Sequence, residues 1–254
     1  TGGTGHIDGF QSYCIGTPSQ AANYLLVEGN VMEDNQGQHT HFGLINSTSS
    51  CGGSTTVIVR HNVIHHNGSF AYVADTNGGL ADHHKVYNNT VVDASRSSHT
   101  TVNLDGCSYA SCLNNIFEDV ISPSAPAQVY LLDGSGTSNG GYNLGYMTSF
   151  PSQTWANPIN SETGKILNQN PLLDSSLELE TGSPAIGTAG PLTTVAVADT
   201  GSGTTLVLTD AAFFQPGWGG GSAAGVLPDE IAIGSLSNHT AIVSINYSTN
   251  TLVI

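Results

Sequence analysis

Short apolar segments with an alternating pattern recur along the first 145 residues. The segments "LLVEGNVMEDN" at 25–35 and "VIVRHNVIHHN" at 57–67 share the form apolar-x-apolar-x-x-Asn-x-apolar. "HKVYNNTVVDA" and "SCLNNIFEDV" repeat it further along the chain. The shared Asn positions are Asn30, Asn62, Asn89 and Asn115, with Asn143 as a weaker fifth member. Runs this short, rich in β-branched residues and ended by Asn-, Gly- or Ser-containing turns, predict strands.

A second column of polar residues falls between these Asn positions. Its members are Asp8, Asn46, Asp75, Asp105 and Asp133. Two columns that stay in phase at an irregular period of 26–38 residues argue against a helical repeat. They predict a parallel β-solenoid, in which each coil buries its apolar face only against neighbouring coils. Asn tolerates left-handed backbone and bonds local backbone groups, so the aligned Asn side chains are expected at sharp turns, stacked as a ladder.

These coils resemble the right-handed parallel β-helix proteins of the pectate-lyase-like superfamily. The segment "NPLLDSSLELETGSPAIGTAG" at 170–190 is similar to the "L-x-x-x-SPAID-x-G" segment that ends many such bacterial proteins, with Gly187 where that pattern has Asp. "GHIDGFQ" at 5–11 is similar to an "H-x-D-G-[FI]-Q" coil of some secreted members. The resemblance implies a right-handed β-helix. It specifies no reaction, because the superfamily contains lyases, hydrolases, epimerases, phage spikes and adhesins.

The pattern of apolar and polar residues changes after about residue 191. The remaining segments alternate like antiparallel strands joined by tight polar turns. We therefore expect an all-β protein with a parallel β-helix over 1–190 and a small antiparallel β-barrel or hairpin module over 191–254. Phe213, Phe214 and Trp218 are expected to serve this module as core or lid aromatics.

Charge narrows the range of partners. Only 9% of the residues are charged, and 19 acidic residues against 4 Lys and Arg give a formal net charge of −15. Such a surface repels nucleic acid, anionic membranes and polyanionic glycans, unless cations bridge the contact. No apolar run approaches the ~18 residues of a membrane-spanning helix. The chain starts at Thr1 without an initiator Met or signal peptide, which suggests a mature secreted chain or a fragment.

The Cys and Asn residues suit an extracellular or cell-surface protein. Four Cys allow three disulfide connectivities, and the favoured one joins Cys14 to Cys51 and Cys107 to Cys112. Four small buried thiols are the alternative. Asn-x-Ser/Thr sequences, which permit N-glycosylation, include Asn46, Asn67 and Asn238.

The positions after the ladder Asn vary from coil to coil and are candidates for chemistry. Three residues after it come Glu33, His65, Val92 and Glu118, and four after it come Asp34, His66, Asp93 and Asp119. Neighbouring coils lie about 4.8 Å apart, so these side chains are expected to stack. His65 and His66 would then lie between acidic residues of the neighbouring coils. They could form salt links or bind a metal. Alternatively, this is a solvated turn in which acidic residues and histidines merely avoid the stacking of like charges.

Two sets of residues are candidate metal ligands. His39 and His41 share one face of a strand and, with His83, suit a metal that prefers nitrogen ligands. The column through Asp75, Asp105 and Asp133 resembles acidic ladders that hold Ca²⁺, which prefers six to eight oxygen ligands. Alternatively, the histidines are scattered surface residues, and each Asp only begins a turn.

Catalytic candidates are few because cations are scarce. Lyase action on uronates needs a base and cationic groups that stabilise an enolate-like intermediate. Arg60 and Lys85 lie in neighbouring coils and could supply the charge, with His65 or His83 as the base. Paired carboxylates such as Asp75 and Asp105 could instead hydrolyse glycosidic bonds.

The sequence therefore leaves two classes of function open. The first is an extracellular protein that binds or processes a polysaccharide in a groove, either a neutral glycan or an acidic one bridged by cations. The second is a non-catalytic structural protein, such as a filament subunit, spike or adhesin, that assembles through the solenoid ends and the terminal strand "TLVI". An enzyme should bring Arg60, Lys85 or the histidines together on a groove, whereas an assembling protein should form high-mass species.

Overall fold

The structure is a computed structural model. It describes residues 10–13, 25–33, 42–45, 56–65, 72–75, 83–93, 101–104, 109–120, 126–132, 138–198, 203–218 and 225–254. None of these segments is helical. The chain divides into two compact units, Thr1–Gly190 and Pro191–Ile254, which are described separately.

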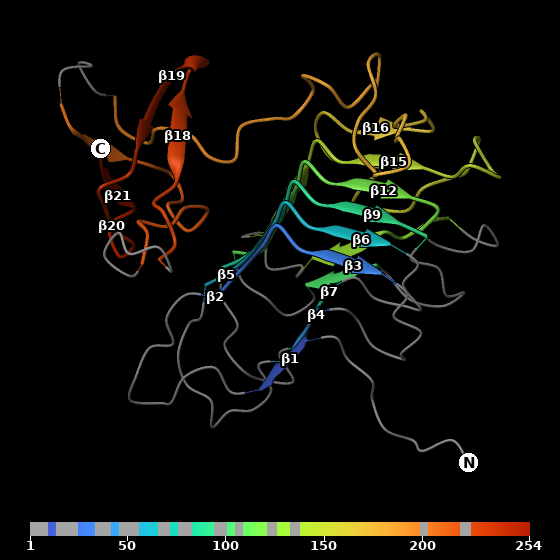
Figure 1. The fold of residues 1–254 in the computed structure, drawn as a ribbon, viewed down its shortest axis with the longest axis horizontal. Helices are drawn as coiled ribbons and strands as arrows, with labels where there is room; N and C mark the ends of the chain where they lie inside the picture. The colour runs from blue at the N-terminus through green and yellow to red at the C-terminus, as the bar shows by residue number, and fades with distance from the viewer. Residues whose placement is uncertain are drawn as a thin grey trace. The chain divides into compact units, whose positions relative to one another are not determined.

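The first unit is a solenoid built from three parallel sheets (Figure 1). Sheet 1 contains β1 (Phe10–Tyr13), β4 (Phe42–Ile45), β7 (Tyr72–Asp75), β10 (Val102–Leu104) and β13 (Tyr130–Leu132). Sheet 2 contains β2 (Leu25–Glu28), β5 (Val57–Arg60), β8 (His84–Tyr87), β11 (Ser111–Leu113) and β14 (Asn139–Gly141). Sheet 3 contains β3 (Val31–Glu33), β6 (Val63–His65), β9 (Thr90–Val92), β12 (Ile116–Glu118), β15 (Leu144–Tyr146) and β16 (Ile166–Leu167). The prediction of a parallel solenoid is confirmed.

The register of the strands matches the alignment made from the sequence. In sheet 2, Val27, Val59, Val86 and Cys112 follow one another in register. In sheet 3, the corresponding residues are Met32, Ile64, Val91 and Phe117. All eight belong to the core cluster or pack against it, so the apolar residue of each repeat points inward. Burial of these stacked apolar side chains is the main stabilising contribution to the solenoid.

The five aligned Asn residues form a continuous hydrogen-bonded ladder at the corner between sheets 2 and 3. At each step the Oδ1 of one Asn accepts from the backbone N–H and the Nδ2 of the Asn one coil earlier. Between Asn62 and Asn89 these two distances are 3.1 and 3.0 Å. The Nδ2 of Asn62 also donates to the carbonyls of Val27 and Arg60, each at 3.0 Å. The ladder therefore provides hydrogen-bond partners for backbone groups at the corner, where the strands are interrupted and their ladder bonds cannot do so.

The left-handed residue of this corner is the one before the ladder Asn. Gly29, His61, Asn88, Asn114 and Tyr142 occupy this position, with φ between 53° and 67°. The sequence pattern led us to expect left-handed backbone at the ladder Asn itself. The structure corrects that expectation: the left-handed residue makes the bend, and the ladder Asn that follows it directs its backbone N–H to the Asn of the next coil.

The ladder ends at the carboxyl group of Glu162, a residue that does not belong to the repeat. Glu162 Oε1 accepts from the backbone N–H of Asn143 at 2.6 Å, and its Oε2 accepts from Asn143 Nδ2 at 3.0 Å. The hydroxyl of Tyr130 also donates to Oε2. Glu162 is 9% exposed, and burial raises the pKa of its carboxyl group. Glu162 thus caps the ladder by accepting the last set of donors.

The second unit consists of antiparallel strands, as predicted. β17 (Thr205–Val207), β21 (Thr251–Val253) and β20 (Ser244–Asn246) form one sheet, and β18 (Glu230–Ile233) pairs with β19 (Ser235–Ala241). Its core includes Leu206, Leu208, Ile231, Ile242 and Leu252. Of the three aromatics singled out, Phe213 is buried, Phe214 packs against the core and Trp218 is 38% exposed.

Candidate functional site

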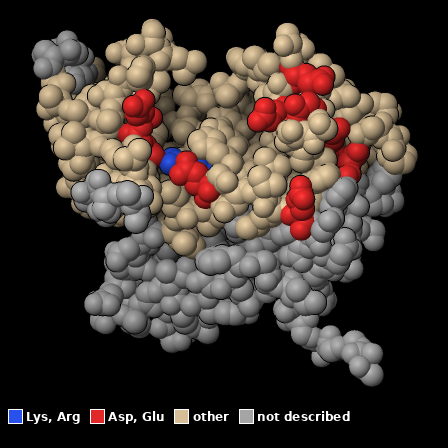
Figure 2. Space-filling view, viewed as in Figure 1, with Lys and Arg blue, Asp and Glu red and all other residues tan. Residues whose placement is uncertain are grey.

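The outer face of sheet 3 carries two rows of side chains. Ile64, Val91 and Phe117 point into the core, so their neighbours on either side point outward. The first row is Val31, Val63, Thr90, Ile116, Leu144 and Ile166. The second row is Glu33, His65, Val92, Glu118 and Tyr146. An apolar row therefore runs beside a polar one, and acidic side chains gather over this face (Figure 2).

Residues 168–190, which we call the return segment, form the wall of a groove beside the first row. The segment contains a small hairpin in which Leu173 bridges Leu179. It is fastened at one end by a 2.6 Å hydrogen bond from Trp155 Nε1 to Asn168 Oδ1. The groove has a volume of about 400 Å³, and its lining includes Thr90, Ile116, Leu144, Leu177, Glu178 and Leu179. This volume falls in the range of small-ligand sites.

Tyr142 forms one end of the groove and is held rigidly. Its ring lies between the backbones of Gly164 and Gly190, where a Cβ on either glycine would come within 2.1 Å of a ring atom. Asn114 fixes the same end of the return segment. Its Nδ2 donates to Gly190 O at 3.1 Å, and its Oδ1 accepts from Gly190 N at 2.9 Å. The groove therefore has a preformed aromatic wall.

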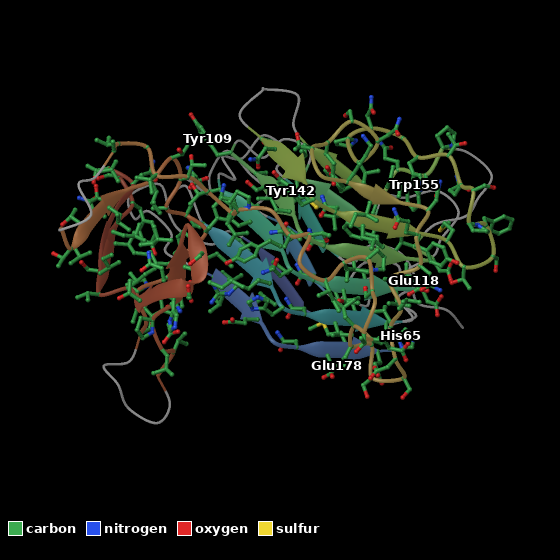
Figure 3. The ribbon with its side chains drawn as sticks, turned by 90° about the horizontal axis from the view of Figure 1, so that it is seen from above. His65, Tyr109, Glu118, Tyr142, Trp155 and Glu178 are labelled. Carbon is green, nitrogen blue, oxygen red and sulfur yellow. The ribbon has the colours of Figure 1, made fainter. Side chains whose placement is uncertain are left out.

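A cluster of carboxylates lies at the second row and at the residues that directly follow it, and includes Glu118, Asp119 and Asp93. Thr148 holds two of them: its Oγ1 donates to Glu118 Oε1 at 3.1 Å, and its backbone N–H donates to Asp119 Oδ1 at 2.6 Å. His65 Nε2 lies 3.7 Å from Asp93 Oδ2. The labelled residues His65, Glu118 and Glu178 lie along one side of the solenoid (Figure 3). The contact between His65 and Asp93 matches the salt-linked alternative for this column.

Glu118 differs electrostatically from an ordinary surface carboxyl group. Partial burial raises its pKa, and the negative charges of Asp119 and Asp93 raise it further. The hydrogen bond from Thr148 acts in the opposite direction but is outweighed. A carboxyl group that keeps its proton to higher pH, with other carboxyl groups beside it, is a candidate general acid.

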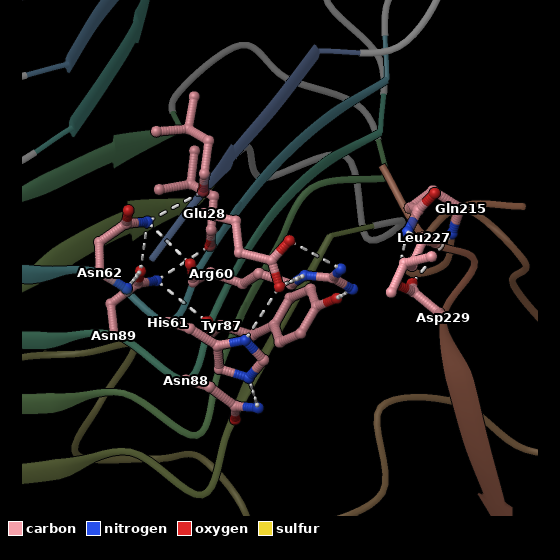
Figure 4. Close-up of polar contacts among 12 residues, drawn as sticks. Glu28, Arg60, His61, Asn62, Tyr87, Asn88, Asn89, Gln215, Leu227 and Asp229 are labelled. Atoms are coloured by element: carbon pink, nitrogen blue, oxygen red, sulfur yellow. Dashed lines mark hydrogen bonds and ion pairs between the residues drawn. The ribbon is translucent and has the colours of Figure 1, made fainter. Parts of the chain in front are cut away.

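Arg60 and Lys85 lie on the outer side of sheet 2 and do not line the groove. Arg60 is 6% exposed; it forms an ion pair with Glu28 and donates to the Tyr87 hydroxyl at 3.0 Å (Figure 4). Lys85 is 1% exposed, and its Nζ donates to Tyr109 O at 2.6 Å and to Ser111 Oγ at 3.2 Å. Both cations make internal contacts, and the structure does not bring them together with His65.

The two histidines before and within β8 also lie away from the groove. The ring of His83 stacks on that of Tyr109, with centroids 4.9 Å apart and planes 7° apart. His84 points into the solenoid, where burial, with lesser contributions from the positive charges of Lys85 and His83, lowers its pKa to about 3. His84 is therefore neutral at ordinary pH.

Several predicted site residues lie outside the described residues. They are His39, His41, Asp105, Asp133, Cys14, Cys51, Cys107, Asn46 and Asn67. Asp75 is the last residue of β7, where only its backbone is described, paired with Ile45. Within the described segments, no group of three or more His, Cys, Asp or Glu side chains is arranged to hold a metal ion. The calcium and histidine metal sites stay predictions.

The structure corrects the predicted pairing of Cys112 with Cys107. Cys112 is a free cysteine and is fully buried in the core cluster. Its Sγ accepts a 3.5 Å hydrogen bond from Asn115 Nδ2, and burial raises its thiol pKa. The physical reason is the inward orientation of Cys112 on β11, in register with Val86 and Gly140. Asn238, a predicted glycosylation site, is exposed on β19.

No protein family matches the chain, and no curated protein or solved structure is significantly similar to it. The fold and the candidate site are therefore described from the residues of this chain alone. No helix among the described residues is long and apolar enough to span a membrane.

Two residues of this site, Tyr142 and Thr148, were not found from the sequence. Tyr142 takes the left-handed position before Asn143, where the earlier coils have Gly, His or Asn, so the repeat gives no reason to expect a ring there. Thr148 occupies no repeated position. Glu118 was placed in the correct column, but its partial burial depends on neighbours that the pattern does not contain.

Proposed function

We propose that the protein is an extracellular β-helix protein that binds a polysaccharide in the groove on sheet 3 and hydrolyses it. One observation carries the proposal. Glu118, whose pKa is raised by burial, stands beside Asp119 on the same outer face that forms the floor of a groove of about 400 Å³. Glycoside hydrolysis commonly needs such a pair: one carboxyl group that holds a proton and one that does not.

The chemistry assigns a role to each member of the pair. Protonated Glu118 donates its proton to the bridging oxygen of the glycosidic bond, which then breaks and releases one sugar chain as an alcohol. Asp119, positioned by the backbone N–H of Thr148, directs a water molecule to the sugar carbon left behind. The water supplies a hydroxyl group to that carbon and a proton that restores the carboxyl pair.

The groove suits the faces and edges of sugar rings. Ile116 and Leu144 give it an apolar floor, and Tyr142 gives it an aromatic wall. Aromatic and aliphatic surfaces pack against the C–H faces of sugars, and amide side chains such as Asn88 bond hydroxyl groups. Binding of this kind needs no charge on the sugar.

Lyase action on an acidic polysaccharide is less well supported. That reaction needs cations against the substrate's carboxylate. In the described part of the chain, Arg60 and Lys85 are buried and engaged on sheet 2. The net charge of −15 also opposes a polyanionic substrate. The resemblance to the pectate-lyase-like superfamily agrees with either reaction, since that superfamily contains both hydrolases and lyases.

The test is the release of reducing ends from a panel of uncharged and amino-sugar polysaccharides. We expect the unchanged protein to hydrolyse at least one of them. Glu118→Gln should lower the rate by about 10²–10⁴-fold, the usual contribution of a general acid. The matched control is Glu230→Gln in the second unit, which should keep full activity.

Two results would contradict the proposal. One is an unchanged rate in Glu118→Gln. The other is a protein that neither binds nor cleaves any polysaccharide and elutes as fibres or high-mass species, which would favour the structural alternative.

A further inference from the structure

The charged side chains in and beside the groove are acidic. Glu178 is the only charged side chain among the described residues that line it. Glu118 and Asp119 are not among the lining residues but belong to the neighbouring carboxylates of sheet 3, and Asp174 and Glu180 lie near Glu178 in the return segment. Lys and Arg contribute only a small spot to this face of the molecule (Figure 2). A ligand in the groove therefore meets a negative potential.

The cations of the described residues do not neutralise this potential. Ion pairs among the described residues include those of Arg60 and His61 with Glu28, of His65 with Asp93, and of His239 with Glu230. None of them involves Glu118, Asp119 or Glu178. Lys165 acts instead on Glu162 at the end of the ladder, where its charge lowers the pKa of that carboxyl group.

We infer that the groove selects a polysaccharide of amino sugars, whose ammonium groups pair with Glu178 on its wall. The inference rests on the proposed function and names its substrate class. Acidic walls around a groove attract cations and repel anions, so they raise the local concentration of a cationic polymer. The apolar floor and Tyr142 bind the sugar rings, and Glu178 distinguishes the amino sugar from its neutral analogue.

The spacing of the coils suits a polymer that runs along the rows. Successive coils are about 4.8 Å apart. A chain laid across β9, β12 and β15 would therefore cross Thr90, Ile116 and Leu144 in turn and pass Glu178 on the wall.

The experiment measures binding in the Glu118→Gln variant, in which cleavage is expected to be slow enough for the oligomers to stay intact. Isothermal titration calorimetry compares glucosamine oligomers with glucose and N-acetylglucosamine oligomers of equal length. We expect glucosamine oligomers to bind more tightly by about two- to fivefold for each ammonium–carboxylate pair formed. This preference should shrink as salt is raised, because exposed ion pairs are screened.

A second variant tests the role of Glu178. Adding Glu178→Gln should weaken glucosamine binding by about two- to fivefold and leave the binding of glucose oligomers unchanged. Glu230→Gln, which removes an acidic group of the second unit, should change neither. Equal losses for charged and neutral oligomers would mean that the substitution only damaged the groove, and would overturn the inference.

The remaining outcomes separate the inference from the proposed function. Equal affinity for all three oligomers, or tighter binding of uronate oligomers, overturns the inference even if the unchanged protein hydrolyses a neutral polysaccharide. Selective binding of glucosamine oligomers that the unchanged protein never cleaves supports the inference and overturns the hydrolytic function.

Discussion

The guanidinium of Arg60 pairs side by side with the carboxylate of Glu28 one coil away. Nε lies 3.1 Å from Oε1, and Nη2 lies 3.2 Å from Oε2. Glu28, Arg60 and Tyr87 are in register on successive strands, and Nη1 donates to the Tyr87 hydroxyl. One side chain therefore ties three coils together, which explains why a scarce cation is buried on the outer side of sheet 2.

Replacing Arg60 should affect stability rather than chemistry. Arg60→Met leaves the Tyr87 hydroxyl and the half-exposed Glu28 without their partner, and should lower the free energy of unfolding by roughly 1.5–3 kcal/mol. Arg60→Lys should recover only part of this loss, because an ammonium group cannot form the paired geometry. Urea denaturation measures both variants. A folded Arg60→Met protein with normal stability but lost polysaccharide binding would contradict this assignment.

The Asn ladder should not tolerate even an isosteric change. In Asn89→Asp, a carboxyl oxygen replaces the Nδ2 that donates to Val59 O, Tyr87 O and Asn115 Oδ1. Buried acceptors would then face one another, and we expect a loss of about 3 kcal/mol or more in the free energy of unfolding. Asn160→Asp, at an exposed position, is the control and should be nearly neutral. Similar unfolding curves for the two variants would argue against the ladder.

The cap of the ladder should make stability depend on pH. Burial raises the pKa of Glu162 above its ordinary value of 4.5, so the folded state holds this proton when the unfolded state has released it. The contribution is fully present below the ordinary pKa and is lost as pH rises through the raised one. Glu162→Gln should remove this slope. The difference between the unfolding free energies of the two proteins, measured by urea denaturation across this range, isolates the effect, and parallel curves would contradict it.

Thr148 should tune the proton affinity of Glu118. Its hydroxyl bond lowers the pKa of Glu118, so Thr148→Val should raise that pKa further. If activity needs protonated Glu118, it is lost as pH rises through this pKa, and the variant should stay active to higher pH. NMR titration of labelled Glu carboxyl groups measures the same shift without a substrate. Thr154→Val, an exposed change, is the control. A shift to lower pH would contradict the assignment.

Gly190 should be essential for the wall of the groove. A Cβ at this position would lie 2.1 Å from the Tyr142 ring, so Gly190→Ala should displace the ring and cost about 1–3 kcal/mol in stability. Polysaccharide binding should weaken with it. In a Tyr142→Ala background the same change should cost little, because the clash is gone. Additive losses in the double variant would show that the ring is not the cause.

The repeat could be predicted because it depends on local, recurring requirements. Every coil needs an inward apolar residue such as Val59 and a ladder residue such as Asn62, so both recur in the sequence. Even the weaker fifth member, Asn143, occupies its place in the ladder. The antiparallel second unit was visible for the same reason, since alternation is a local pattern.

The site could be predicted only in part, because it depends on unique contacts. Glu162 caps the ladder from outside the repeat, and the return segment crosses sheet 3 after the coils have ended. Arg60 was a catalytic candidate because Lys and Arg are scarce in this chain, but the structure shows that it forms an ion pair with Glu28. The spacing of Cys107 and Cys112 suggested a bridge, although the inward alternation of β11 places Cys112 in the core.

The ladder also has a direction. Each Asn passes its two donors toward the next coil and receives the same two from the coil before, so every interior step is interchangeable with every other. Only Glu162 differs, because it accepts without donating onward. The hydrogen bonds of the ladder would therefore survive the insertion or removal of a coil, whereas the contacts of Arg60 with Glu28 and Tyr87 belong to particular coils and would be lost. Among the described residues the ladder has a specialised end at Glu162, and coils added at a distance from this end leave the lining of the groove unchanged.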